Sequence, residues 1–89
     1  MERRGRTENQ TMSDSYEEAR EIANVLDGAG LHEYAEGLRS ALVEGATGTE
    51  IYMILRWRLA EIVNDAEVEA DIKARVRVLY DYLDRALAS

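Results

Sequence analysis

The chain has 89 residues, 11 of them basic and 18 acidic, for a net charge of −7, and it contains neither cysteine nor proline. This length allows one domain, and the lack of cysteine excludes disulfides and thiolate metal sites, which indicates a reducing, cytoplasmic location. No apolar run approaches the ~18 residues of a membrane span. The acidic balance argues against nucleic-acid binding by phosphate neutralisation. We therefore expect a cytoplasmic protein that binds neither membranes nor nucleic acids.

The first twelve residues differ in composition from the rest. Residues 1–12 are polar, hold three arginines against two glutamates and show no apolar period. This pattern predicts a disordered arm, followed by a helical domain over residues 13–89. Met12 stands directly before a helix-start signal. An upstream extension or cloning remnant is therefore favoured over a basic arm that contacts an acidic partner.

Two helices are predicted in the first half of the domain. Ser15 and Glu18 have the spacing of a capping box, which places the start of the first helix there. Apolar residues then recur at helical spacing until Gly28 and Gly30, which we expect to end this helix in left-handed conformations. The second helix occupies about residues 31–44 and is stopped by the glycine that follows it.

Two further helices are predicted in the second half. Thr47 and Glu50 form another capping box and open a helix that runs to about Asn64. Asn64 or Asp65 then starts a fourth helix, which continues almost to the C-terminus. Its apolar face comprises Val68, Ile72, Val76, Leu79, Leu83, Ala86 and Leu87. No segment alternates as a strand would, and the connections are short. The sequence therefore predicts a single-domain, all-α, antiparallel four-helix bundle with a disordered N-terminal arm.

The third predicted helix carries apolar residues on two sides. Met53 and Trp57 project away from its main apolar face, and Val78 and Tyr82 repeat this feature on the fourth helix. A chain this short has few elements to cover both sides, so these four residues are candidates for an interface with another chain. The alternative for Trp57 is that it completes the core, as a lone tryptophan in a small domain usually does.

Arg58 falls inside the apolar face of the third helix. An unpaired buried charge would cost several kcal/mol, so its guanidinium must either reach the edge of the face or pair with a carboxylate. We expect a buried ion pair with Asp27, Glu61 or Asp84. The functional alternative is that the run Arg56-Trp57-Arg58 forms a recognition patch of cation and aromatic type.

The sequence offers no convincing catalytic or cofactor site. His32 and Glu36 stand one helical turn apart and could share a metal ion, but no second cluster of ligands accompanies them. The glycine pairs at 28–30 and 45–48 lack the lysine and the preceding strand of phosphate-binding loops. We predict no catalytic residue, no metal site and no cofactor, and hence no enzyme.

The segment Gly45-Ala-Thr-Gly-Thr-Glu-Ile-Tyr-Met-Ile-Leu-Arg-Trp57 resembles a stretch found in short bacterial helical proteins that have no assigned function. The resemblance extends in helix order over about residues 17–87 but depends chiefly on these thirteen residues. In style the chain is similar to small immunity or antidote proteins. The resemblance implies a bacterial origin and a compact helical domain, and it supplies no catalytic residue.

Three functional hypotheses follow. The first is a protein-binding module, such as an immunity, antidote or regulatory protein, whose acidic face covers a basic site on its partner. The second is a structural homodimer in which the exposed apolar faces of the third helix pair across a two-fold axis. The third, an enzyme or a carrier of a small ligand, lacks the convergent polar groups that such sites require.

Overall fold

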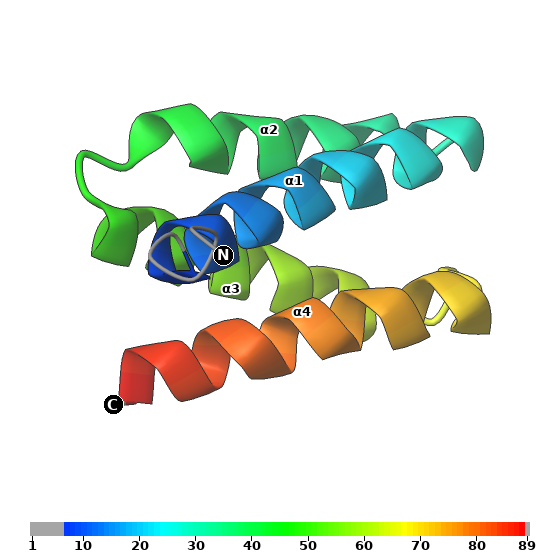
Figure 1. Ribbon diagram of the computed structural model, residues 1–89. Coiled ribbons are helices and arrows are strands. Elements are labelled where there is room, and N and C mark those ends of the chain that lie inside the picture. The colour runs from blue at the N-terminus through cyan, green and yellow to red at the C-terminus, as the bar shows by residue number, and fades with distance from the viewer. Residues whose placement is uncertain (1–6, 89) are drawn as a thin grey trace.

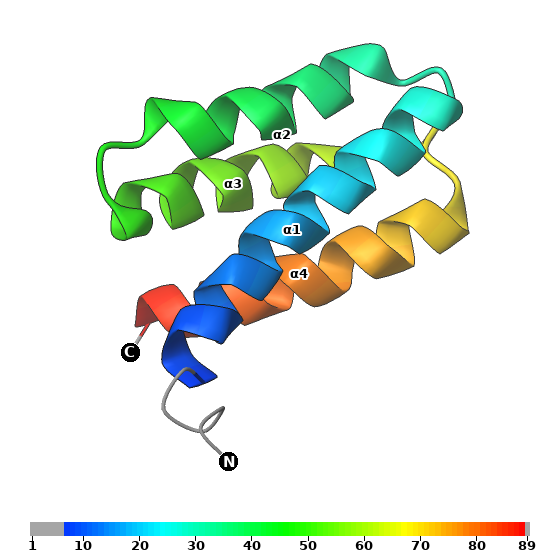
Figure 2. The ribbon, with the colours of Figure 1, turned by 45° about the horizontal axis from the view of Figure 1, so that its top comes forward.

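The protein is a bundle of four α-helices. The structure, a computed structural model, describes the backbone of residues 7–88 and the side chains of residues 14–88. Its helices are α1 (Thr7–Gly28), α2 (His32–Glu44), α3 (Gly48–Val63) and α4 (Ala70–Ala88). Residues 7–88 contain no strand, so the predicted all-α fold with four helices is confirmed. Figures 1 and 2 show the chain turning back at each connection, so that successive helices run in opposite directions.

The helices pack in a ring, α1 against α2, α2 against α3, α3 against α4 and α4 against α1. Each contributes one stripe of apolar side chains to a shared core, because residues three and four apart lie on the same side of a helix. The side chains at the centre of this core are fully buried and include Ile22, Leu26, Leu38, Leu55, Leu59, Ile62, Val76 and Leu83. In this arrangement α1 and α3 lie on opposite sides of the ring.

The first helix begins earlier than the sequence predicts. α1 starts at Thr7, so residues 7–12 are part of this helix, which was predicted to start near Ser15. Nothing in this stretch breaks a helix, since it holds neither glycine nor proline. Residues 1–6 of the predicted arm lie outside the described residues. Ser15 is consequently no N-cap: it is buried inside α1, where its Oγ accepts a hydrogen bond of 3.2 Å from the Tyr52 hydroxyl.

The connection between α1 and α2 depends on one glycine. Gly30 has φ +83°, a left-handed conformation that glycine adopts without strain. The backbone N–H of Leu31 then donates a 2.8 Å bond to the Leu26 carbonyl and completes the end of α1. The prediction of left-handed glycines is thus correct for Gly30 and wrong for Gly28, which is the last helical residue of α1.

The predicted Thr47 cap of α3 is present, and the reciprocal bond of the predicted capping box is shifted by one residue, from Thr47 to Ala46. The Glu50 N–H donates to the Thr47 Oγ1 at 3.2 Å, and the Glu50 carboxylate accepts from the Ala46 N–H at 2.8 Å. Both backbone donors at the start of this helix therefore have acceptors. The helix ends at Val63 with Asn64 as its C-cap, close to the predicted end.

The fourth helix begins later than predicted. α4 starts at Ala70 rather than at Asn64 or Asp65, because Asp65 forms a turn instead of a helix cap. Its carboxylate accepts the Glu67 N–H at 2.8 Å, two residues ahead, which is the geometry of an Asx turn. Val68 is buried all the same, so it adds to the apolar stripe of α4 from outside the helix.

Ion pairs join the helices along the ring. Arg75 on α4 pairs with Glu18 at 2.7 Å and with Glu21 at 2.9 Å on α1, and Arg56 on α3 pairs with Asp84 at 2.6 Å on α4. The Glu18 carboxylate raises the pKa of the Arg75 guanidinium. All these groups are at least partly exposed, so each pair adds little to stability but fixes the register between its helices.

Candidate functional site

An apolar stripe faces solvent on the outside of α3. Met53, Trp57 and Ala60 follow one another at helical spacing, and Trp57 is two residues, or 200°, from both Leu55 and Leu59 in the core. The side chains of Met53 and Trp57 are 51% and 59% exposed. We call these three residues the α3 outer stripe. The predicted alternative that Trp57 completes the core is therefore wrong.

A hollow of about 190 Å³ adjoins this stripe at Ala60. It lies between α3 and α4, and its lining includes the apolar Val63, the aromatic Tyr80 and the charged Arg77 and Asp81. The two charged residues form no ion pair within the described part of the chain. The outer stripe thus continues into a depression that could receive an apolar side chain of another molecule.

Arg58 does not form the predicted ion pair. Among the described residues no carboxylate pairs with it, because Asp27 is engaged by Arg39 and Asp84 by Arg56. Its Nε is buried without a hydrogen-bond acceptor. The Arg58 Cζ lies instead 5.0 Å from the centroid of the Trp57 ring, within the range of a cation–π contact. The predicted association of a cation with the tryptophan is therefore present.

Gly37 makes room for this arginine. A Cβ at Gly37 would lie 3.3 Å from the Arg58 Cδ, so the arginine stem passes across α2 at its one glycine between the helix ends. The sequence pattern did not predict this contact. A glycine inside an otherwise regular helix was the available signal, because it marks close approach by another group.

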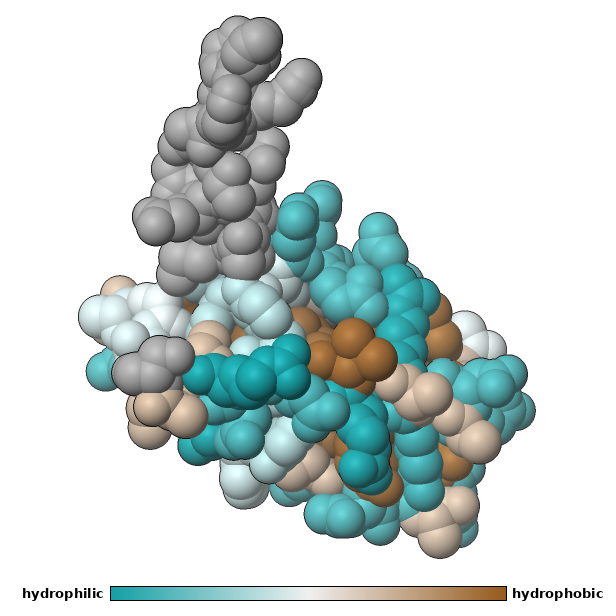
Figure 3. All heavy atoms as spheres, turned by 60° about the horizontal axis from the view of Figure 1, so that its bottom comes forward, coloured by the Kyte–Doolittle hydropathy of each residue, from teal (hydrophilic) through white to brown (hydrophobic). Residues whose placement is uncertain are grey.

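Val78 and Tyr82 do not share a surface with Met53 and Trp57. They line a hollow of about 310 Å³ between α4 and α1, together with Asp14, Ser15, Glu18 and Leu79. From the side that carries α4, apolar atoms come to the surface among hydrophilic ones (Figure 3). Val78 is 72% exposed, whereas Tyr82 is half-buried and packs edge-on against the Tyr52 ring, with centroids 6.4 Å apart. The four predicted interface residues therefore fall on two separate faces.

Charge is divided between the helices in a way that bears on these faces. α1 carries six acidic residues and one basic residue, and α2 carries three and one. In contrast, α3 carries two acidic and two basic residues, and α4 carries three acidic and four basic residues. The remaining acidic excess lies in the connection between α3 and α4. The outer stripe thus belongs to a nearly neutral pair of helices, and the acidic surface belongs mainly to α1 and α2.

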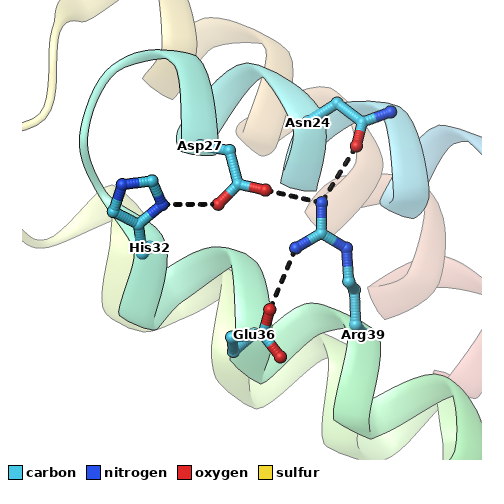
Figure 4. Close-up of polar contacts among 5 residues, drawn as sticks. All are labelled: Asn24, Asp27, His32, Glu36 and Arg39. Carbon is cyan, nitrogen blue, oxygen red and sulfur yellow. Dashed lines mark hydrogen bonds and ion pairs between the residues drawn. The ribbon is translucent and has the colours of Figure 1, made fainter.

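A polar cluster joins the end of α1 to the start of α2 (Figure 4). Arg39 donates to Asp27 at 2.7 Å, to Asn24 at 2.9 Å and to Glu36 at 3.2 Å, while the His32 Nδ1 lies 2.9 Å from the other Asp27 oxygen. The bond with His32, and then the bond with Arg39, lower the pKa of Asp27. His32 is thus held by a carboxylate, and the cluster links the end of α1 to α2.

A second polar link connects α2 to the end of α3. The Tyr34 hydroxyl donates to the Asp65 carboxylate at 2.5 Å. This bond raises the pKa of Tyr34 to about 12 and lowers the pKa of Asp65. No local pattern predicts this pair, because the two residues are 31 positions apart and meet only once α2 and α3 are in register.

Raising the pH should break the Tyr34–Asp65 link before the protein as a whole unfolds. The folded-state pKa of Tyr34 lies above its ordinary value of 10.0, so its contribution is complete below pH 10 and is lost as the pH rises to about 12. We expect wild type to be more stable than Tyr34→Phe at neutral pH, and this difference to vanish over that window. Urea unfolding of both chains checks this, and a difference independent of pH would contradict it.

The described residues show neither a metal-binding group nor a membrane span. No three His, Asp or Glu side chains in this part of the chain gather closely enough to hold a metal ion. Among the same residues, no helix has both the length and the apolarity needed to cross a membrane. Comparison of the chain with protein-family models, with curated proteins and with solved structures gave no match.

Proposed function

We propose that the chain is a protein-binding module and that the α3 outer stripe is its contact surface. The observation that carries the proposal is the pairing of Met53 and Trp57, two large apolar side chains one turn apart and each more than half exposed. Tryptophan is the residue type most enriched at the energetic centre of protein interfaces, and arginine is also favoured there. Arg58 stacks on the Trp57 ring and the adjoining hollow offers a receptor for an apolar group.

The charge distribution indicates which surface of the chain would cover a basic site on a partner. A partner with a basic site would meet the acidic helices α1 and α2, whereas a partner anchored by Trp57 meets the neutral pair α3 and α4. The anchor and the acidic face therefore serve different contacts, and the outer stripe favours a partner surface without strong charge. An immunity, antidote or regulatory role in a bacterial cytoplasm is part of this proposal, and an enzyme or ligand carrier remains the alternative.

Trp57→Ala should abolish partner binding while leaving the fold intact. Because the side chain is 59% exposed, we expect the free energy of unfolding to change by less than about 1 kcal/mol. A photo-crosslinking amino acid at position 53 should capture a protein in native lysate when Trp57 is present and lose that product in Trp57→Ala. Urea unfolding and mass spectrometry of the crosslinked product are the two measurements.

The matched control is a crosslinker at position 43. Val43 is 81% exposed on α2, so a probe there samples the same solvent without the outer stripe. Equal capture from positions 43 and 53, or capture that survives Trp57→Ala, would show that the stripe is not the contact surface. A loss of several kcal/mol in Trp57→Ala would place the ring in the core and defeat the proposal by another route.

A further inference from the structure

We propose that the occupant of the α3 outer stripe is a second copy of this chain, paired with the first across a two-fold axis. This inference rests on the proposed function and names the partner of the same surface. Two observations carry it: the neutrality of the helices that border the stripe, and the presence beside it of unpaired charges of both signs.

A chain of net charge −7 pairs most readily with its own copy through a surface that carries little net charge. Two such chains repel each other unless the contact lies away from their excess charge. Docking through the outer side of α3 brings together helices with balanced charge, and it leaves the acidic α1 on the opposite side of each bundle. No other helix of this bundle combines balanced charge with two large exposed apolar residues among its described side chains.

One flank of α3 carries a positive and a negative residue, so it can pair with the same flank of a second copy. Arg58 and Glu61 lie on the side of α3 that faces α2: Arg58 crosses Gly37, and the charge of Glu61 acts on Tyr34 and helps to raise its pKa. Neither forms an ion pair within the described residues. When two helices pair in opposite directions across a two-fold axis, each flank meets the same flank of the copy. Arg58 of each chain then meets Glu61 of the other, and two equivalent ion pairs form.

The size of the surface sets the expected strength. α3 has 16 residues, which is ~24 Å of helix, and with the edges of the two helices beside it α3 offers a strip ~20 Å wide. The resulting ~500 Å² is below the ~800 Å² that each partner contributes to a standard interface. We therefore expect a dimer that dissociates on dilution, with half-association between ~10 and ~500 μM.

The first test is the solution molar mass of the full chain, measured by sedimentation from ~5 μM to ~1 mM. We expect the mass to rise from monomer to dimer, and Trp57→Ala to weaken association at least ~10-fold. Val78→Ala is the control, because Val78 is exposed on the α1 side of α4. A monomer throughout, or a dimer that Trp57→Ala does not weaken, would overturn the inference.

Charge exchange tests the proposed pairing. Arg58→Glu should weaken the dimer about 10-fold, and Arg58→Glu with Glu61→Arg should bring it back to within ~3-fold of wild type. Arg58→Glu with Glu17→Arg is the matched control, since it restores the same net charge from an exposed position on α1. Equal rescue by both double variants would mean that only net charge matters, and the Arg58–Glu61 pairing would be wrong. Circular dichroism melting checks that each variant folds.

Salt and crosslinking separate this inference from the proposed function. Salt screens the repulsion between two acidic chains, so dimerisation should strengthen from low salt to ~0.15 M, where the screening length is ~8 Å. Binding of the outer stripe to a different protein whose surface carries no strong charge, as proposed above, would change little over the same range. If the chain stays monomeric while a probe at position 53 captures a different protein, the second copy is excluded and the proposed function stands. If the probe captures neither, the proposed function fails as well.

Discussion

Leu59→Ala should remove about 3 kcal/mol from the free energy of unfolding, the largest single loss we expect in this chain. Leu59 is fully buried in the apolar stripe of α3, the helix that packs against both α2 and α4. Truncation leaves a cavity that neighbours anchored on three helices can only partly fill. A domain of this size has about 5–10 kcal/mol of stability in total, so the variant would lose a third or more of it.

Urea unfolding of Leu59→Ala beside Val78→Ala measures this loss. Val78 is 72% exposed on α4, so its truncation removes few contacts, and the stability should stay within about 0.5 kcal/mol of wild type. Similar losses in both variants would mean that burial at Leu59 does not set the stability. A loss below about 1 kcal/mol in Leu59→Ala alone would mean that the core relaxes around the gap.

Gly45→Ala should cost about 2 kcal/mol, although this glycine has no unusual backbone conformation. Its φ of −74° and ψ of 138° are open to any residue. The constraint is space: a Cβ at position 45 would lie 2.7 Å from the Ile51 backbone nitrogen and 3.0 Å from its Cα. Because these atoms belong to the first turn of α3, they cannot move aside as a flexible side chain could.

Gly28→Ala is the matched control for this substitution. A Cβ at Gly28 meets nothing within 4 Å, and the residue is the last of α1. Alanine there should stabilise the protein by about 0.5–1 kcal/mol, because it restricts the unfolded chain and favours helix. Thermal and urea unfolding of the two variants should therefore shift in opposite directions. A shift in the same direction would show that packing at Ile51 is not what requires glycine at position 45.

Local patterns were sufficient to predict the helices and most of the core. The predicted apolar face of the last segment is buried at five positions, because spacing alone determines which residues share one side of a helix: Val68, Ile72, Val76, Leu79 and Leu83. Thr47 and Glu50 were correctly predicted as a cap for a similar reason, since both partners lie within one turn. The starts of α1 and α4 were wrong because capping residues at Ser15 and Asn64 also occur inside helices and at helix ends.

The candidate site depends on tertiary structure that no local pattern contains. Whether the second apolar side of α3 is covered is decided by how four helices close into a ring, and that ring leaves Trp57 outside while it half-buries Tyr82. The lack of an ion pair at Arg58 likewise follows from the register of α3 against its neighbours, which gives Asp84 to Arg56 instead. The sequence was sufficient to identify these residues as candidates, but it was not sufficient to predict which face of the bundle each of them lies on.

The ring of helices also has a consequence for the kinetics of folding. Three of its four contacts join helices that follow one another in the chain, and only the contact of α1 with α4 joins distant segments. The mean sequence separation of contacts is therefore low, which is characteristic of domains that fold in microseconds to milliseconds. Only the α1–α4 contact requires a long loop to close, which costs conformational entropy. Arg75 bridges Glu18 and Glu21 at this seam. That seam is thus the natural place for the native bundle to open first.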